Sequence, residues 1–303
     1  MADMLNIEPT KVTSWGTAAL LGEGPSWHQD SDRLYWVDIK GQQLHWLDLP
    51  TGTHHFQTVD EPLCWVLPTD GDWLLAGFHR SVELLHPSTF TRKRLFSLQH
   101  EPSGNRLNDA KLDRQGRLWF GSMHDQERQS SGNLYRMSEP GIAECVDSGY
   151  VVSNGPAVNK SGDCLYHSCS SSRVIFRFCL DDKGNLSDKQ PFIRFSGNMG
   201  FPDGMTIDSE GGLWVAQWGG GGICRFDVQG KLERRIAMPV PYITSLAFGG
   251  ENLSRLFVTS ASLPLSAAQR KAMPTAGCLF ELDCGFSGVA EVSFALPDMY
   301  QPD

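Results

Sequence analysis

Leu118-Trp-Phe-Gly-Ser-Met, near the middle of the chain, belongs to a set of six short apolar runs that recur along the sequence. The other five runs occupy residues 34–39, 73–78, 165–170, 213–218 and 256–261. Each is followed by a second apolar run, at residues 44–49, 82–85, 134–137, 174–178, 223–227 and 279–283. Several short strands in a unit of about forty to fifty residues are typical of one propeller blade. The sequence therefore predicts an all-β fold, a six-bladed β-propeller.

Length and hydropathy agree with this fold. Radial repetition lets a fold grow without enlarging a single hydrophobic core, so residues 1–303 are expected to form one domain. The apolar runs are too short to span a bilayer. The first residues, Met1-Ala-Asp-Met-Leu-Asn, lack the basic-then-apolar order of a signal peptide. We therefore expect a soluble, cytoplasmic protein without a membrane partner.

The eight cysteines and the net charge of −9 narrow the classes of function. No Cys-x-x-Cys pair occurs, which excludes a zinc knuckle and a thioredoxin-like motif. The cysteines are scattered, and Cys164, Cys169, Cys179, Cys224 and Cys278 lie in or beside the apolar runs, so they are expected to be buried free thiols. No nucleic-acid partner is expected, because the acidic chain contains only one short basic cluster, at residues 92–94.

Acidic turns stand before most of the first apolar runs. Asp113-Arg-Gln-Gly116 and Asp208-Ser-Glu-Gly211 have the residue types of a tight hairpin with a glycine at positive φ. A calcium loop would need oxygens at alternate positions and a closing bidentate carboxylate, which these stretches lack. The turns are therefore predicted to be plain hairpins.

A second set of polar residues lies where the first strand of each unit should begin, near the propeller axis. Alignment of the units on their hairpins brings four of them to nearly equivalent positions: Glu23, Asn108, Asn154 and Asp203. Two carboxylates that face one axis repel each other unless a cation or a proton lies between them. With two amide carbonyls they form an all-oxygen set suited to a hard divalent ion. For any single position, a simple turn role of Asn-Gly or Asp-Gly is the alternative.

Four motifs resemble the SMP-30/gluconolactonase/LRE family, also called regucalcin-like. They are Gly22-Glu-Gly-Pro25, Arg106-Leu-Asn-Asp109, Ser153-Asn-Gly155 and Pro202-Asp-Gly-Met205. The resemblance covers nearly the whole chain, including all six apolar runs. It implies a six-bladed propeller with a metal site in the central channel, and an enzyme that hydrolyses sugar lactones to aldonic acids.

The resemblance also implies roles for the axial residues. The metal ligands would be Glu23, Asn154 and Asp203, with Asn108 close to the ion or bound to it. The cofactor would be one divalent metal ion, which could be calcium, zinc, magnesium, manganese or iron. Asp203 matches the family's general base, although the ion itself could instead activate the water.

The substrate-binding residues follow from the same comparison. Arg106 and Asn108 match the positions that hold the sugar, and a salt bridge from Arg106 to Asp109 or Glu101 is the structural alternative. Three further candidates for the pocket wall are Gln126, His124 and Trp218. Gln126 takes the place where animal members carry an acidic residue, so substrate preference is expected to differ from theirs.

Three functions are compatible with these residues. The first is a metal-dependent hydrolase of glucono-, galactono-, arabinono- or xylonolactone. The second is a hydrolase of phosphotriesters or other esters on the same fold, and the third is a non-catalytic calcium-binding propeller. A serine hydrolase is disfavoured because the chain has no Gly-x-Ser-x-Gly motif. The sequence does not define the oligomeric state, nor whether residues 262–276 form a lid, an interface or a surface loop.

Overall fold

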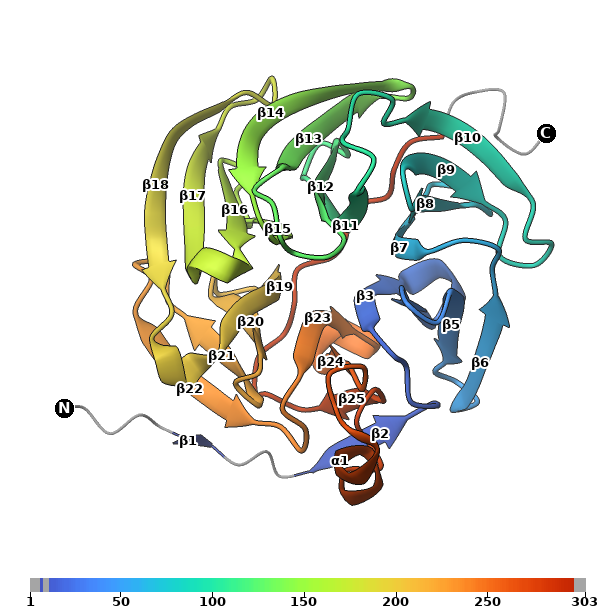
Figure 1. Ribbon diagram of the computed structural model, residues 1–303, viewed down its shortest axis with the longest axis vertical. Helices are drawn as coiled ribbons and strands as arrows, with labels where there is room; N and C mark the ends of the chain where they lie inside the picture. Colours follow the sequence, from blue (N-terminus) through green and yellow to red (C-terminus); the bar gives the residue numbers. More distant parts are fainter. Residues whose placement is uncertain (1–5, 8–10, 297–303) are drawn as a thin grey trace.

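Six β-sheets surround a central channel in the computed structural model, which describes residues 6–7 and 11–296 (Figure 1). Each sheet contains four strands in an antiparallel meander, and one of the six has a fifth strand. The predicted six-bladed β-propeller is therefore confirmed.

Each blade begins with an innermost strand beside the channel and continues outward to the rim of the propeller. Blade 1 contains β3 (Gly22–His28), β4 (Arg33–Asp38), β5 (Gln43–Asp48) and β6 (Thr53–Thr58). Blade 2 contains β7 (Leu63–Pro68), β8 (Leu74–Phe78), β9 (Ser81–Leu85) and β10 (Arg92–Ser97). Blade 3 contains β11 (Asn105–Leu112), β12 (Leu118–His124), β13 (Gly132–Glu139) and β14 (Ile142–Tyr150).

Blade 4 contains β15 (Ser153–Val158), β16 (Cys164–Cys169), β17 (Val174–Leu180) and β18 (Leu186–Arg194). Blade 5 contains β19 (Phe201–Ile207), β20 (Leu213–Trp218), β21 (Gly222–Phe226) and β22 (Leu232–Ala237), with β1 (Asn6–Ile7) parallel to β22. Blade 6 contains β23 (Ile243–Gly249), β24 (Arg255–Ser260), β25 (Leu279–Leu282) and β2 (Val12–Trp15). The helices are α1 (Ala267–Ala272) and the 3-10 turns η1 (Gln29–Ser31), η2 (Ser170–Ser172), η3 (Gly197–Met199) and η4 (Glu251–Leu253).

Blade 6 is built from both ends of the described chain. Strand β2 pairs antiparallel with β25, and the Trp15 indole donates a hydrogen bond of 2.7 Å to Glu281. This pairing covers the edge of β25, which would otherwise present unpaired backbone groups. After β25, residues 283–296 cross behind the channel, where Gly288 bridges to Asp208 of blade 5 and Phe294 to Thr69 of blade 2 (Figure 1).

The six first apolar runs form the second strand of each blade, and the second runs form the third strand. The second strands are buried on both faces because neighbouring blades pack against each side, which explains their continuous apolar character. Five of them place a buried aromatic residue near the start of the strand: Tyr35, Trp119, Tyr166, Trp214 and Phe257. These rings fill the space between adjacent blades.

The predicted hairpins are present, and their aspartates have a further role. Gly211 adopts a φ of +87°, as the hairpin before β20 requires. Asp208 caps this hairpin by accepting from the Gly212 amide at 2.9 Å. Its carboxylate also accepts from the Trp214 indole at 2.7 Å and from Arg225 Nε at 2.6 Å. The acidic turn thus ties the hairpin to the core of blade 5.

Asp208→Ala is expected to destabilise the protein by about 2–4 kcal/mol, because it removes the fully buried carboxylate of Arg225 and leaves this guanidinium with only the more exposed Glu210 and Glu233. The Trp214 indole also loses its acceptor. The measurement is the free energy of unfolding from urea titration. Asp181→Ala is the matched control, since Asp181 caps an exposed hairpin in blade 4, where water can replace the lost hydrogen bonds and the loss of stability should be much smaller. Equal losses in both variants would contradict the role given to Asp208.

The thiols agree with the expectation in part. All eight cysteines are free, and five of them are buried. Cys179, which was expected to be buried, is exposed, and its cross-strand neighbour Cys164 is only partly buried, because this face of blade 4 is left uncovered at that end. Among the described helices, none has the length and apolar character needed to cross a membrane. Residues 1–5, on which the expected absence of a signal peptide mainly rests, lie outside the described residues.

Candidate active site

Every innermost strand contains a β-bulge at the same level of the channel. In each case one extra residue interrupts the pairing with the second strand of the blade. A bulge bends the strand and changes the direction of nearby side chains. The four predicted axial residues lie at or directly beside these bulges: Glu23 in β3, Asn108 in β11, Asn154 in β15 and Asp203 in β19.

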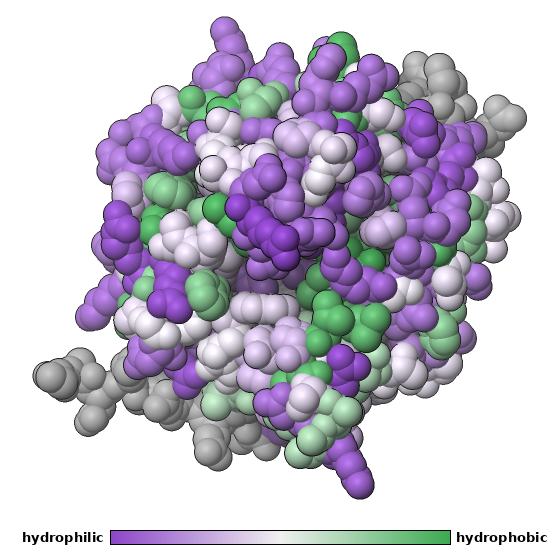
Figure 2. Space-filling model, viewed as in Figure 1, coloured by the Kyte–Doolittle hydropathy of each residue, from purple (hydrophilic) through white to green (hydrophobic). Residues whose placement is uncertain are grey.

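These four side chains line one cavity of about 530 Å³ at the mouth of the channel. The cavity opens on the face seen in Figure 2, where a central hollow has hydrophilic side chains on one side and hydrophobic ones on the other. Leu21 and Leu263 contribute to the apolar part of its wall. The cavity therefore combines a polar floor with an apolar border.

Of the three residues predicted to form the pocket wall, two line the cavity and one does not. Gln126 and Trp218 line the cavity, and the Trp218 ring packs against Tyr242 with the centroids 4.9 Å apart. His124 is absent from the cavity lining, and its Nδ1 accepts from the Gln126 amide at 3.2 Å. His124 thus shapes the loop after β12.

Several cavity residues had not been recognised in the sequence: Lys40, Asp125, Glu127, Ser170, Ser171 and Phe201. Most of them follow the second strand of a blade directly or within a few residues, at the end near the channel mouth. The available signal was a charged or hydroxyl residue at the end of a first apolar run or within a few residues after it. The loops after these strands differ in length and composition, so no alignment of the units points to them.

The start of segment 262–276 contributes to the rim of the cavity. Leu263 and Pro264 line the cavity, and the Leu263 amide donates a 2.9 Å hydrogen bond to the carbonyl of Leu20. The rest of the segment contains α1, which begins with a capping box at Ser266. The start of the segment is therefore a wall of the cavity.

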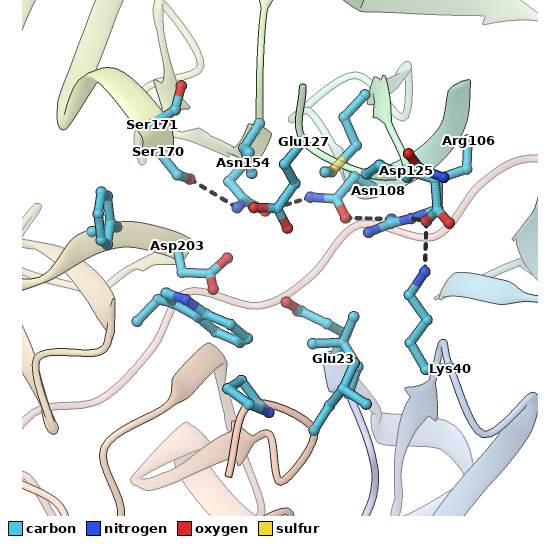
Figure 3. A pocket seen from close by; sticks show the side chains of 18 residues that line it. Glu23, Lys40, Arg106, Asn108, Asp125, Glu127, Asn154, Ser170, Ser171 and Asp203 are labelled. Carbon is cyan, nitrogen blue, oxygen red and sulfur yellow. Dashed lines mark hydrogen bonds and ion pairs between the residues drawn. The ribbon is translucent and has the colours of Figure 1, made fainter. Parts of the chain in front are cut away.

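Glu23 and Asp203 face each other across the cavity floor, as Figure 3 shows. Both side chains are buried, and Asp203 Oδ1 has no hydrogen-bond partner in the described part of the chain. Burial, reinforced by the charge of Asp109, raises the pKa of Glu23 to about 8. Burial and the nearby Glu23 also hold the pKa of Asp203 well above its usual range. The positive charge of Arg106 lowers the pKa of Glu23 but does not outweigh these effects, so the two carboxylates are only partly compensated.

The incompletely compensated negative charge of Glu23 and Asp203 is suited to binding a cation. Within residues 6–7 and 11–296, no cluster of three or more His, Cys, Asp or Glu side chains has the arrangement of a metal site. The candidate set instead combines the two carboxylates with an amide oxygen of Asn154, a donor chemistry that suits hard divalent ions. The unpartnered oxygen of Asp203 is the feature of this structure that such an ion would satisfy.

A chain of hydrogen bonds links the polar residues of the floor. Arg106 Nη1 donates to Asn108 Oδ1 at 2.6 Å, and Asn108 Nδ2 donates to Asn154 Oδ1 at 2.7 Å. Asn154 Nδ2 then donates to Ser170 Oγ at 2.9 Å, and Ser170 Oγ donates to the carbonyl of Pro202 at 2.6 Å. The chain runs across blades 3, 4 and 5.

Arg106 is paired with a residue other than the two considered from the sequence. Its Nε lies 2.6 Å from Asp125 Oδ1, and Lys40 Nζ lies 2.7 Å from the same oxygen. The alternative salt bridge to Asp109 or Glu101 is therefore wrong. Asp109, which follows Asn108 in the bulge of β11, lines a separate small cavity. Glu101 instead accepts a hydrogen bond from the Ser122 hydroxyl.

Comparison with known proteins identifies the family. Residues 21–262 match the SMP-30/Gluconolactonase/LRE-like region. The chain is 32% identical over 281 residues to the putative sugar lactone lactonase YvrE of Bacillus subtilis, with 92% of this chain and 96% of that protein covered. It is 33% identical over 281 residues to the pentonolactonase XacC of Haloferax volcanii, with 91% and 94% covered.

Among solved structures, the calcium-binding protein regucalcin from Agrobacterium tumefaciens superposes with a TM-score of 0.88 at 28% identity, covering 92% of this chain and 95% of that one. The chain belongs to the SMP-30/gluconolactonase/LRE family, as the four motifs indicated.

Without metal, the protein is expected to become more stable as the pH falls from about 8.5 to about 6.5. In this window the unfolded chain keeps its carboxyl groups ionised, whereas folded Glu23 and Asp109, with pKa values of about 8 and about 7, take up protons. The folded state then binds more protons than the unfolded state, so the free energy of unfolding rises as the pH falls. Histidines whose pKa is lowered by burial, such as His28, His45 and His167, oppose this trend increasingly as the pH approaches 6.5, where half of their imidazoles are protonated in the unfolded chain.

The measurement is urea unfolding in the presence of EDTA at three pH values across this window. Glu23→Gln should reduce the slope by up to about 1.4 kcal/mol per pH unit, which corresponds to one proton. A slope of opposite sign in the wild-type protein would show that the channel carboxylates are ionised without metal.

Proposed function

We propose that this protein is a sugar lactonase, a carboxylic ester hydrolase that opens aldonolactones to aldonic acids with one divalent metal ion in its channel. The observation that carries the proposal is the pair of buried carboxylates, Glu23 and Asp203, beside the donor-rich Arg106 in one cavity. Two relatives support the reaction class, the pentonolactonase XacC and the putative sugar lactone lactonase YvrE.

Glu23, Asn154 and Asp203 would hold the ion. Asn108 is better suited to supporting Asn154, because its oxygen faces the positively charged Arg106 guanidinium, which disfavours a second cation there, while its nitrogen donates to Asn154 Oδ1. When bound, a divalent ion supplies Lewis acidity toward the lactone carbonyl oxygen and acidity to a water molecule. The all-oxygen ligand set favours calcium, magnesium or manganese.

Asp203 is suited to the role of general base. Its carboxylate borders the cavity, so one oxygen could hold the ion while the other accepts the proton of an attacking water. Burial by itself makes this carboxylate a stronger base than it would be in water, and a bound ion would lower its basicity again by stabilising the charged form. Glu23 shares the negative charge of the floor but accepts from the Gly24 amide at 3.1 Å.

Arg106 and Lys40 are suited to binding the oxygens of the sugar. Asp125 holds both cationic groups at one side of the cavity, so they are oriented before substrate arrives. On the other side, Trp218 and Leu263 offer apolar surface to the C–H groups of a sugar ring. The cavity volume of about 530 Å³ is ample for a single sugar ring.

The wild-type protein is expected to accelerate proton release from aldonolactones only when a divalent ion is present. Metal-stripped protein is mixed with glucono-, galactono-, arabinono- and xylonolactone before and after addition of each ion, and acid production is compared with spontaneous hydrolysis. Asp203→Asn should reduce turnover by a factor of about 10² or more, because it removes both the base and a ligand charge.

Near-normal turnover in Asp203→Asn would overturn the assignment of the site. If no lactone is hydrolysed faster although the ion binds, the protein is instead a hydrolase of other esters or a binding protein.

Arg106→Ala is expected to raise KM for the preferred lactone by a factor of about 10 or more, since it removes charge-assisted hydrogen bonds to the sugar. The measurement is steady-state kinetics at saturating metal. Arg194→Ala is the control, because Arg194 is exposed on β18, the outermost strand of blade 4. An unchanged KM would limit Arg106 to its structural contacts with Asp125 and Asn108.

A further inference from the structure

We propose that Ser170 is a positioning residue that holds two ligands of the ion, Asn154 and Asp203, in register across two blades. This inference rests on the proposed metal-dependent function. Ser170 is buried at the start of η2 and lines the cavity beside Asn154. Its hydroxyl makes two hydrogen bonds that join neighbouring blades.

The groups at the two ends of this series of hydrogen bonds, Arg106 and the carbonyl of Pro202, determine which atom donates in every bond between them. A guanidinium group has only donors, so Arg106 requires the oxygen of the Asn108 amide to face it. Asn108 Nδ2 is then directed toward Asn154 Oδ1, and Asn154 Nδ2 toward the Ser170 hydroxyl. At the other end, the carbonyl of Pro202 can only accept, so the Ser170 proton points to it.

This polarity decides which atom of Asn154 can serve as a ligand. Rotation of the Asn154 amide by half a turn would bring its Nδ2 against the Nδ2 of Asn108, so that two donors would face each other. The same rotation would turn Oδ1 toward Ser170 and away from its place beside Asn108. Ser170 thus provides the acceptor that lets Asn154 keep its oxygen available to an ion.

Ser170 also connects two strands that carry ligands. Asn154 lies on β15 of blade 4, and Pro202, which directly precedes Asp203, lies on β19 of blade 5. One hydroxyl accepts from the first strand and donates to the second. It therefore holds the Asn154 amide against the backbone from which the Asp203 carboxylate projects. Partners of metal ligands that act in this way typically change metal affinity by 10- to 100-fold when they are removed.

The test is isothermal titration of metal-stripped protein with Ca²⁺ and with Mn²⁺. Ser170→Ala is expected to weaken binding of the ion about 10- to 100-fold. Ser170→Thr keeps a hydroxyl and should retain most of the affinity. Ser172→Ala is the matched control: Ser172 belongs to the same turn but donates to the carbonyl of Cys169, and its loss should leave binding unchanged. Circular dichroism of each metal-free variant establishes that it is folded.

The outcomes separate this inference from the function on which it rests. If the wild-type protein binds neither ion, the metal assignment itself is overturned, and the role of Ser170 with it. If the wild-type protein and folded Ser170→Ala bind the ions equally well, or if Ser170→Thr loses as much affinity as Ser170→Ala, the positioning role is overturned. At saturating metal, Ser170→Ala should lower kcat more than it changes KM, because the substrate contacts of Arg106 are retained.

Discussion

The whole site depends on the bulge that interrupts each innermost strand at one level of the channel. Regular strands would alternate their side chains between the two faces of a blade, where neighbouring blades bury them in apolar surroundings. The extra residue breaks this alternation and directs the side chains at that level toward the axis. The propeller ring then brings together residues that are separated by as many as 180 positions, from Glu23 to Asp203.

This convergence creates an electrostatic conflict within the fold. Glu23, Asp203 and Asp109 are all buried near the axis, and each has a raised pKa. Water cannot solvate them fully, and each disfavours the charge of the others. A site of this kind lowers the stability of the metal-free protein, and it is maintained by the surrounding blades. The same conflict produces affinity for a cation and a basic carboxylate, the two properties that lactone hydrolysis would use.

The ring is not symmetric in its chemistry. Blades 1, 3, 4 and 5 carry carboxylates or amides at the bulge, whereas blade 2 carries Cys64 and blade 6 carries Thr244. Both of these residues are buried, and Thr244 donates to the carbonyl of Gly22. Asn108, Asn154 and Asp203 therefore lie on the side formed by blades 3, 4 and 5, and Glu23 of blade 1 faces them. Hydrogen bonds from Arg106 through Asn154 to Pro202 join blades 3, 4 and 5 into a rigid support for that side.

The repeat determined the fold by itself, because each unit carries its own strand lengths, turn residues and buried aromatic rings. It also determined the axial residues, since equivalent positions of repeated units must converge once the ring closes. The sequence alone did not reveal Lys40, Asp125 and Ser170, which lie just after second strands in loops that differ between blades. It placed His124 in the pocket, whereas the structure turns that ring toward the backbone of its own loop. Only the tertiary structure decided these contacts, because a partner such as Asp125 for Lys40, or Pro202 for Ser170, is chosen by the distance between blades and leaves no periodic pattern in the chain.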